Sequence, residues 1–427
     1  MELDVPELTA LAMTVGGLLL AVSCVLSRVG ARFGLPVSLM FLAVGVLAGC
    51  DGLGGIEFDE FPLAYTAGTI ALSAVLFAGG LQTNVRHLRG AVAPASVLAT
   101  VGVLGVASIT ALGGYWLGLP WHEAWLIGAI VASTDASAVF SVLQGVTLPR
   151  RVAHTIELES GLNDPMAVIL TLAMTAHLLG EPISATSLAL EVLHQLAVGA
   201  AFGVALGYAT RMLLLRAPLS TPALTPVLTL GSALIAFGAP TLFGGSGFLA
   251  AYFAGMVVGN APLRHRTQLL RVHDSLSWLS QVSMFLMLGL LVTPSHLPRA
   301  AWIGLPLALI LALVARPLTV YLCLLPFRFD WRQKAFIAWV GLRGAVPIVL
   351  ATVPVLRSEG QPAHMVEALD VFDLVFFVVV VSSFLPGATV QLTARWLGLE
   401  GGESRASESA NPPAPMLASV ERPTLAG

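Results

Sequence analysis

Long apolar stretches alternate with short polar segments along most of the chain. A helix that crosses a lipid bilayer needs about 20 mostly apolar residues, and about thirteen runs near this length precede residue 397. The second and ninth runs are short for a full crossing. The runs are 8–26, 36–50, 66–83, 92–117, 122–145, 154–178, 190–214, 222–242, 245–260, 273–294, 301–325, 332–356 and 368–396. This pattern predicts an all-α protein that passes through a membrane many times.

The basic residues predict the orientation in the membrane, because cytoplasmic loops are enriched in Arg and Lys. Fifteen of the 21 basic residues lie in alternate connecting segments, whereas the other connecting segments hold only Arg299 and Arg357. The fifteen are Arg28, Arg32, Arg86, Arg89, Arg150, Arg151, Arg211, Arg216, Arg264, Arg266, Arg271, Arg328, Arg332, Lys334 and Arg395. The distribution predicts an external N-terminus, a cytoplasmic C-terminus and an odd number of crossings.

The hydrophobic pattern stops near residue 397. Residues 398–427 are rich in Pro, Ser, Ala and Glu and lack the apolar content of a core. We therefore expect a transmembrane domain over residues 1–397, a disordered cytoplasmic tail over 398–427 and no folded regulatory domain. The acidic N-terminus is unlike a cleavable signal peptide, so the first apolar run is expected to stay in the protein.

Composition agrees with a membrane protein and excludes several partners. Hydrophobic residues make up 56% of the 427 residues and charged residues 11%, whereas soluble domains have about 25% charged residues. A net charge of −3 gives no reason to expect nucleic acid. The three cysteines have neither metal-ligand spacing nor a disulfide pattern. No cofactor is predicted.

An internal repeat is indicated by a constant offset. Gly45 and Gly49 match Gly255 and Gly259 at an offset of 210, and the segment LFAGGLQT matches FLMLGLLVT at the same offset. The offset pairs the fifth run with the twelfth, which are interrupted by STDASA and GLRGAVP. Many transporters consist of two inverted repeats with broken helices at matching positions. We therefore predict inverted six-helix repeats with discontinuous crossing helices.

Ionisable residues within the bilayer are costly and mark functional sites. Ser160 and Asp164 are four residues apart and share one helix face, whereas Glu159 lies about 140° around the helix from Asp164. We assign Asp164, with the Ser160 hydroxyl, to the transported ion. We assign Glu159 to an ion pair with Arg343, which needs a partner if it is buried.

Two further positions keep alternative interpretations. Thr134 and Asp135 interrupt an apolar run, where an unwound helix could expose carbonyl groups to a cation and Asp135 could strengthen the field. The same two residues could instead simply cap a helix. Arg316 could extend towards the interface or satisfy the carbonyl groups of a broken helix.

The segments GAIVASTDASAVFSVL, ELESGLNDPMAVILT, GGSGFLAAYFAGMVVGN and GLRGAVPIVLA together resemble the monovalent cation:proton antiporters of the sodium/proton exchanger type. The resemblance covers about residues 8 to 396. It is strongest to the bacterial potassium/proton branch that is linked to cell-volume regulation. One departure is Ala78, where relatives commonly have an acidic residue.

The resemblance implies a 13-span fold with core helices at about 92–178 and 301–396 and dimerisation, or scaffold, helices at about 8–83 and 190–294. It implies a homodimer and elevator-like alternating access. It also implies that Asn163 marks electroneutral exchange, that Glu159 pairs with Arg343, and that the cation contacts four residues, which are Thr134, Asp135, Ser160 and Asp164.

The sequence therefore predicts a secondary antiporter, not an enzyme, in which Asp164 holds either a dehydrated K⁺ (or Na⁺) or a proton and the loaded site crosses the membrane. Selectivity for sodium over potassium is left open. A cation channel would need a filter-like repeat, which we do not find. An intramembrane hydrolase would need a nucleophile with a base or a metal cluster. The surplus of carboxylates argues against a carrier of organic anions.

Overall fold

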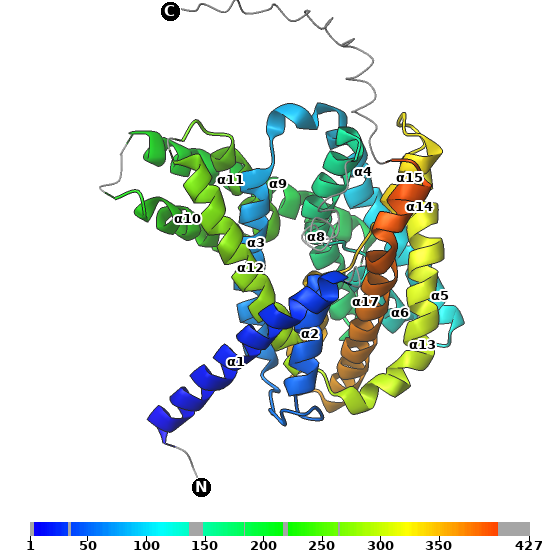
Figure 1. Cartoon of the computed structure of the whole chain (residues 1–427). Coiled ribbons are helices and arrows are strands. Elements are labelled where there is room, and N and C mark those ends of the chain that lie inside the picture. Colours follow the sequence, from blue (N-terminus) through cyan, green and yellow to red (C-terminus); the bar gives the residue numbers. More distant parts are fainter. Residues whose placement is uncertain are drawn as a thin grey trace, which may run out of the picture.

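The computed structural model describes residues 4–32, 36–135, 148–182, 184–216, 221–263 and 265–399. Within these ranges the regular structure is helical apart from an isolated β-bridge between Gly49 and Ile56. The prediction of an all-α protein is therefore confirmed (Figure 1). Residues 136–145 of the fifth predicted run and nearly all of the predicted tail lie outside the described residues.

Each predicted apolar run coincides with a helix or an interrupted helix. Seven runs form long uninterrupted helices, which are α1 (Val5–Arg32), α3 (Phe61–Gln82), α8 (Arg150–Leu178), α9 (Ala185–Arg216), α10 (Leu224–Leu242), α12 (Arg266–Leu290) and α17 (Pro362–Trp396). The two runs identified as short are α2 (Val37–Ala48) and α11 (Gly247–Gly259). By length and apolar composition, seven helical stretches of the described chain can cross a membrane. The number of crossings stays a prediction.

Of the four remaining runs, three are interrupted helices, and the described part of the fifth run is a helix that ends in non-helical backbone. A π-helical turn divides the fourth run into α4 (Val92–Val97), η2 (Leu98–Gly102) and α5 (Val103–Trp116), and the eleventh into α13 (Leu297–Ile310), η4 (Leu311–Ala315) and α14 (Arg316–Cys323). Non-helical backbone follows α6 (Trp121–Ile130) in the fifth run and separates α15 (Trp331–Trp339) from α16 (Ala345–Arg357) in the twelfth. Short 3₁₀ turns, η1 (Val85–Gly90) and η3 (Pro294–His296), precede α4 and α13.

The internal repeat is visible in two close helix contacts. The backbone carbonyl of Leu286 in α12 lies against Gly45 in α2, and that of Phe77 in α3 lies against Gly255 in α11. The glycine positions differ by 210 (255 minus 45) and the carbonyl positions by 209 (286 minus 77). Only glycine fits at such contacts, because a Cβ on Gly45 would lie 2.9 Å from the Cα of Gly289. The α3 and α12 helices are therefore matched one residue out of the predicted register.

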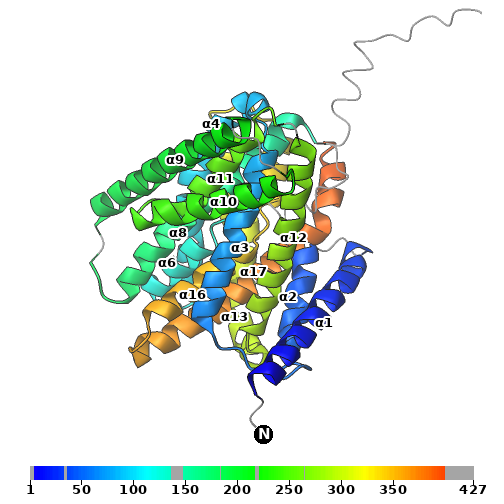
Figure 2. The ribbon, with the colours of Figure 1, turned by 90° about the vertical axis from the view of Figure 1, so that its left-hand side faces the viewer.

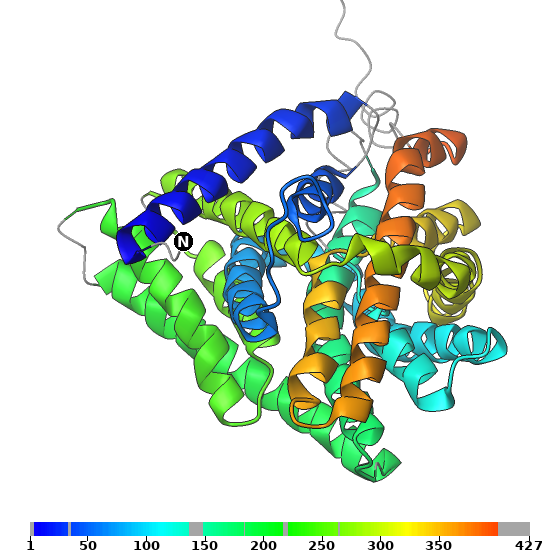
Figure 3. The ribbon, with the colours of Figure 1, turned by 90° about the horizontal axis from the view of Figure 1, so that it is seen from below.

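The helices group around the middle of the molecule. Helix α11 packs against α3 and α9, and α12 packs against α2 and α3, whereas α5 packs against α6 and α13 against α17 (Figures 1 and 2). Viewed from below, α16 and α17 lie side by side near the centre, and α1 lies along one edge (Figure 3). Helix α8 contacts members of both groups, including α6 and α11. The division into core and scaffold domains stays a prediction.

Candidate functional site

Two unwound segments meet at the centre of the repeat. Helix α6 ends at Ile130 and residues 131–135 are not helical, while residues 340–344 separate α15 from α16. The backbone N–H of Asp135 donates to the carbonyl of Leu342 at 2.9 Å. The carboxyl group of Asp135 lies beside Gly344, where a side chain would overlap it, at the N-terminus of α16. A helix N-terminus favours negative charge, so the segment that ends α6 also places a carboxylate on the start of α16.

Arg343 binds the open end of α6. Its Nη1 donates to the carbonyl oxygens of Ala132 at 3.1 Å and Ser133 at 2.8 Å. Those carbonyl groups lie past the last turn of α6, where a cation is favoured and where unpaired acceptors would be costly in lipid. Arg343 therefore satisfies the carbonyl groups of the broken helix. This is one of the two roles that the sequence suggested for Arg316.

The predicted ion pair between Glu159 and Arg343 is wrong in its basic partner. Glu159 pairs with Arg316, through Nη1 and Oε1, and both side chains are buried. Arg316 is the first residue of α14, directly after the π turn, and it packs over Gly341, where a Cβ would lie 2.6 Å from its Nε. The π turn adds a residue to the helical turn and so changes the face from which Arg316 projects. Sequence spacing alone does not reveal that change.

A hydrogen-bonded group joins α8 to the unwound segment after α6. The hydroxyl groups of Thr134 and Ser160 lie 3.0 Å apart, and Asn163 Nδ2 donates to Thr134 Oγ1 at 2.6 Å. All three side chains are buried. The structure thus brings together three of the predicted site residues. It also gives Asn163 a contact that the sequence did not predict, because its amide orients the threonine hydroxyl.

Asp164 lies next to this group on α8. It is 3% exposed, and its Oδ1 makes no hydrogen bond within the described part of the chain. A buried carboxylate without a donor or a cation is strongly disfavoured, so this oxygen needs either a proton or a metal ion. Asp164 therefore has the environment expected of a carboxyl group that takes up an ion.

A cavity of about 320 Å³, named here the site cavity, leads to Asp164 and Asp135. Among the described residues, its polar lining contains four carboxyl groups, several hydroxyl and amide groups, and no Arg, Lys or His. The residues with polar side chains are Gln82, Thr83, Asp135, Glu157, Ser160, Asp164, Tyr252, Asp274, Ser277, Trp278 and Gln281. Glu157, Tyr252 and Asp274 are not among the site residues predicted from the sequence. Helical spacing could have identified Glu157, because seven residues bring it to within about 20° of Asp164 around the helix.

A second group of ionisable residues lies away from this site. A cavity of about 290 Å³, named here the remote cavity, is lined by Glu123, His296, Arg299, Asp370 and Asp373 among others. The two cavities lie at opposite ends of helix α3. Phe61, at its start, contacts Phe372 beside the remote cavity, and Gln82, its last residue, lines the site cavity.

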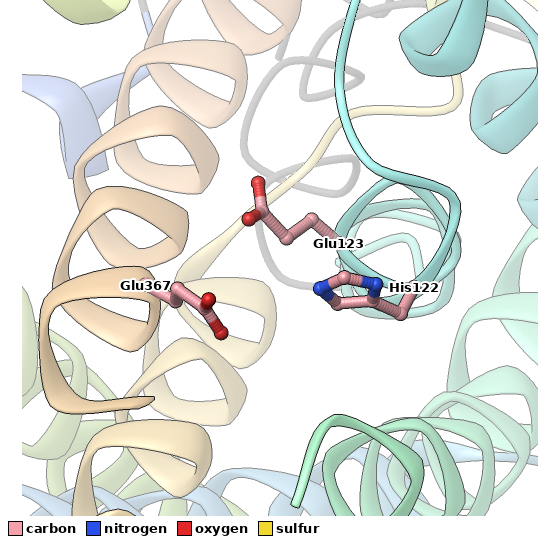
Figure 4. A group of neighbouring side chains, drawn as sticks. All are labelled: His122, Glu123 and Glu367. Carbon is pink, nitrogen blue, oxygen red and sulfur yellow. The ribbon is translucent and has the colours of Figure 1, made fainter. Parts of the chain in front are cut away.

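His122, Glu123 and Glu367 also lie at the remote end, with one ligand atom of each within 4.8 Å of the others (Figure 4). All three side chains are half-buried. Nothing else within the described residues points to an ion at this group, so we assign none.

Comparison with known proteins shows which family the sequence matches. The sodium/hydrogen exchanger transmembrane family matches residues 18–396. The chain is 44% identical over 397 residues to the K(+)/H(+) antiporter NhaP of Alkalimonas amylolytica, which covers 92% of this chain and 68% of that relative. It is 45% identical over 390 residues to the K(+)/H(+) antiporter NhaP2 of Shewanella oneidensis, covering 90% of this chain and 67% of the relative.

A solved structure gives an independent comparison of the fold. The sodium proton antiporter MjNhaP1 from Methanocaldococcus jannaschii matches 91% of this chain and 99% of its own, with a TM-score of 0.79 at 23% identity. At this identity the match establishes the fold alone. The sequence match extends over nearly all the described helices and includes the crossing segments and Asp164. The chain therefore belongs to the sodium/hydrogen exchanger family.

Proposed function

We propose that this chain exchanges K⁺ for protons, with Asp164 as the carboxyl group that holds one ion or the other. The observation that carries the proposal is the buried Asp164 Oδ1, which lacks a hydrogen-bond donor in the described chain, on a residue that lines the site cavity. Burial favours a neutral site, which either a bound cation or a proton would provide. Both ions would use the same oxygen, so they would compete.

The charges around the two unwound segments, where they meet, support an electroneutral exchange. Three carboxyl groups, those of Asp135, Glu159 and Asp164, and two guanidinium groups, those of Arg316 and Arg343, gather there. When all five are ionised, one negative charge remains. One monovalent cation or one proton would neutralise it, and each step of the cycle would then carry the same charge across the membrane.

The lining of the site cavity favours a cation carrier over the rival functions. An anion would meet four carboxyl groups and no basic side chain on the described walls. A channel would need a continuous path, whereas the site cavity and the remote cavity share no lining residue in the described part of the chain. Potassium is favoured over sodium as the substrate because the relatives at 44% and 45% identity are named K(+)/H(+) antiporters.

We further propose that the protein is a homodimer in a bacterial inner membrane, with its N-terminus outside. The excess of Arg in alternate segments supports this orientation, and it puts the site cavity on the cytoplasmic side, because Arg86 and Arg89 follow Thr83 directly. Only 6% of the apolar stretch of α1 is buried in the described structure, so the surface of this helix needs lipid or a second copy to cover it.

The decisive experiment measures proton movement in proteoliposomes with a pH-sensitive dye. We expect K⁺ pulses to drive proton release at half-saturating concentrations that rise as the pH is lowered, with a weaker response to Na⁺. Asp164→Asn should abolish exchange, because an amide binds neither ion as a carboxylate does, while the protein stays folded. Retained exchange in that variant, or K⁺ uptake insensitive to pH, would sink the proposal. Asp373→Asn, in the remote cavity, is the matched control.

A further inference from the structure

A chain of three side chains crosses the site cavity from α8 to the helices opposite. Thr83, at the end of α3, places its Oγ1 2.9 Å from Glu157 Oε1 on α8 and 3.1 Å from the Tyr252 hydroxyl on α11. Tyr252 is 3% exposed, and Glu157 is half-buried. None of the three residues belongs to the group around Asp164. They nevertheless connect the ion-bearing helix to α3 and α11, two of the helices that line the cavity with it.

The Thr83 hydroxyl has one proton and two acceptors at 2.9 Å, the Glu157 carboxyl group and the backbone carbonyl of Gly79. When Glu157 is ionised, its carboxylate is the stronger acceptor, so Thr83 donates towards it and accepts the proton of Tyr252. A hydrogen bond to an ionised carboxylate is roughly twice as strong as one between neutral groups. The contact between the helices is therefore strongest with the glutamate charge in place, and each hydroxyl group can be removed separately.

This chain of three side chains lies N-terminal to the ion site along α8. Glu157 is two helical turns, about 10 Å, from Asp164 on nearly the same face. Gly161 lies between them, and a Cβ there would approach the Tyr252 ring to 3.0 Å at Cζ. Tyr252 thus contacts the bare backbone of α8 between the two carboxyl groups, while its hydroxyl reaches Thr83. Movement of α8 relative to α3 and α11 would break both contacts.

We propose that Glu157 is a positioning residue for exchange: through Thr83 and Tyr252 it holds α8 against α3 and α11 in the state with an open site cavity. The inference rests on the proposed function, because a carrier must present its ion site to each side in turn. Weakening the chain lowers the population of the open state. The apparent affinity for the cation on that side falls by the same factor, because only the open state binds it from there.

The test uses the full-length protein and single-atom or isosteric changes. Tyr252→Phe removes one hydroxyl, Thr83→Val removes the central one, and Glu157→Gln keeps the acceptor oxygen but removes the charge. For each we expect the KM for K⁺ at the cavity side to rise about three- to tenfold while the maximal rate stays within about twofold. The double variant of Thr83 and Tyr252 should be no worse than Thr83→Val, because the tyrosine hydroxyl acts through the threonine.

A second readout reports the cavity itself. In a background without Cys24, Cys50 and Cys323, Gln82→Cys places a thiol on the cavity wall. Tyr252→Phe should slow its labelling by a membrane-impermeant maleimide by a factor similar to the rise in KM. The control is Thr229→Val, which removes another buried hydroxyl, bonded to His273 at 2.8 Å and absent from the cavity lining.

The outcomes separate this inference from the function it builds on. Absence of exchange in the unmodified protein would contradict the proposed function. Normal exchange, with KM and labelling in Tyr252→Phe equal to those of the Thr229→Val control, would overturn the positioning role alone. So would a fall in maximal rate with unchanged KM. Tyr252→Phe keeps the ring on Gly161, so it remains decisive if Thr83→Val fails to fold.

Discussion

The site cavity and the remote cavity are similar in size, about 320 Å³ and 290 Å³, and both have acidic walls. They differ in how the fold balances that acidity. In the remote cavity, Asp373 lies 3.1 Å from His296 and Asp370 lies 3.8 Å from Arg299. In the site cavity, no basic side chain lines the described walls.

The buried surroundings of the site follow the same distinction. Glu159 and Arg316 pair with each other, and Arg343 serves the carbonyl groups of α6, so each of these charges has a partner in the protein, although Glu159 Oε2 and Arg316 Nε make no hydrogen bond in the described chain. Asp164 Oδ1 also makes no hydrogen bond there, and no basic side chain of the described chain lines the cavity that leads to it. The comparison teaches that a surplus of carboxyl groups marks a cation site only where the fold supplies no internal cation. Changes to balanced charges should therefore affect stability, and changes at the site cavity should affect transport.

The largest expected effect comes from breaking the balanced pair. Arg316→Met leaves Glu159 buried without its partner, which costs about 3–5 kcal/mol of stability. We expect a large fall in the yield and melting temperature of the purified protein. Replacing both residues, as Arg316→Met with Glu159→Leu, should recover most of the loss, because no unpaired charge remains. Thermal unfolding in detergent measures both. A single variant as stable as the parent would contradict a structural pair.

A second prediction concerns a change that should affect transport and leave stability nearly unchanged. Asp135→Asn should lower K⁺-driven exchange by at least about tenfold, because the asparagine removes one of the charges around the site, while the melting temperature changes little. Asp370→Asn in the remote cavity is the matched change. Its partner Arg299 is exposed, and exposed pairs contribute about 0–1 kcal/mol, so exchange should stay within twofold. Equal effects of the two variants would erase the distinction between the cavities.

Much of the fold was predictable because its causes are local. A run of apolar residues specifies a membrane helix without knowledge of its neighbours, and polar residues such as Thr134 and Asp135 in such a run predict its interruption. The meeting of the two interrupted helices followed from the repeat. The role of Arg316 did not, because a π turn just before it changes the direction of its side chain, and no periodicity in the sequence announces that turn.

The candidate site was predictable in part for the same reason. Ser160 and Asp164 share a helix face by spacing alone, and both line the site cavity. Glu157 shares that face too, but its partners Thr83 and Tyr252 lie on helices far away in the sequence. Spacing could have located its side chain on the helix and could not have supplied its contacts. The Asn163 amide bond to Thr134 is of the same kind.

The smallest expected effect is at the remote end, on a loop carboxylate that is balanced mainly by hydrogen bonds. The hydroxyl and N–H groups of Ser295 lower the pKa of Asp51 below its usual value of 3.8, with a smaller contribution from His296. The N–H lies 3.3 Å from Oδ2. Because the folded state has the lower pKa, the stabilisation is complete above the unfolded pKa and is lost as the pH falls through the folded one.

Asp51→Asn should therefore lower the melting temperature slightly and by a constant amount at neutral pH, and the difference should vanish in acid as the parent loses its own contribution. Exchange should be unchanged, because neither Asp51 nor its partner Ser295 is among the described residues that line the site cavity. Melting curves of the two proteins from pH 7 to pH 3 make the comparison. A difference that grows towards acid would mean that the folded protein binds the proton at Asp51 more tightly than the unfolded chain does. The remote end would then contain a carboxyl group that the fold leaves unbalanced.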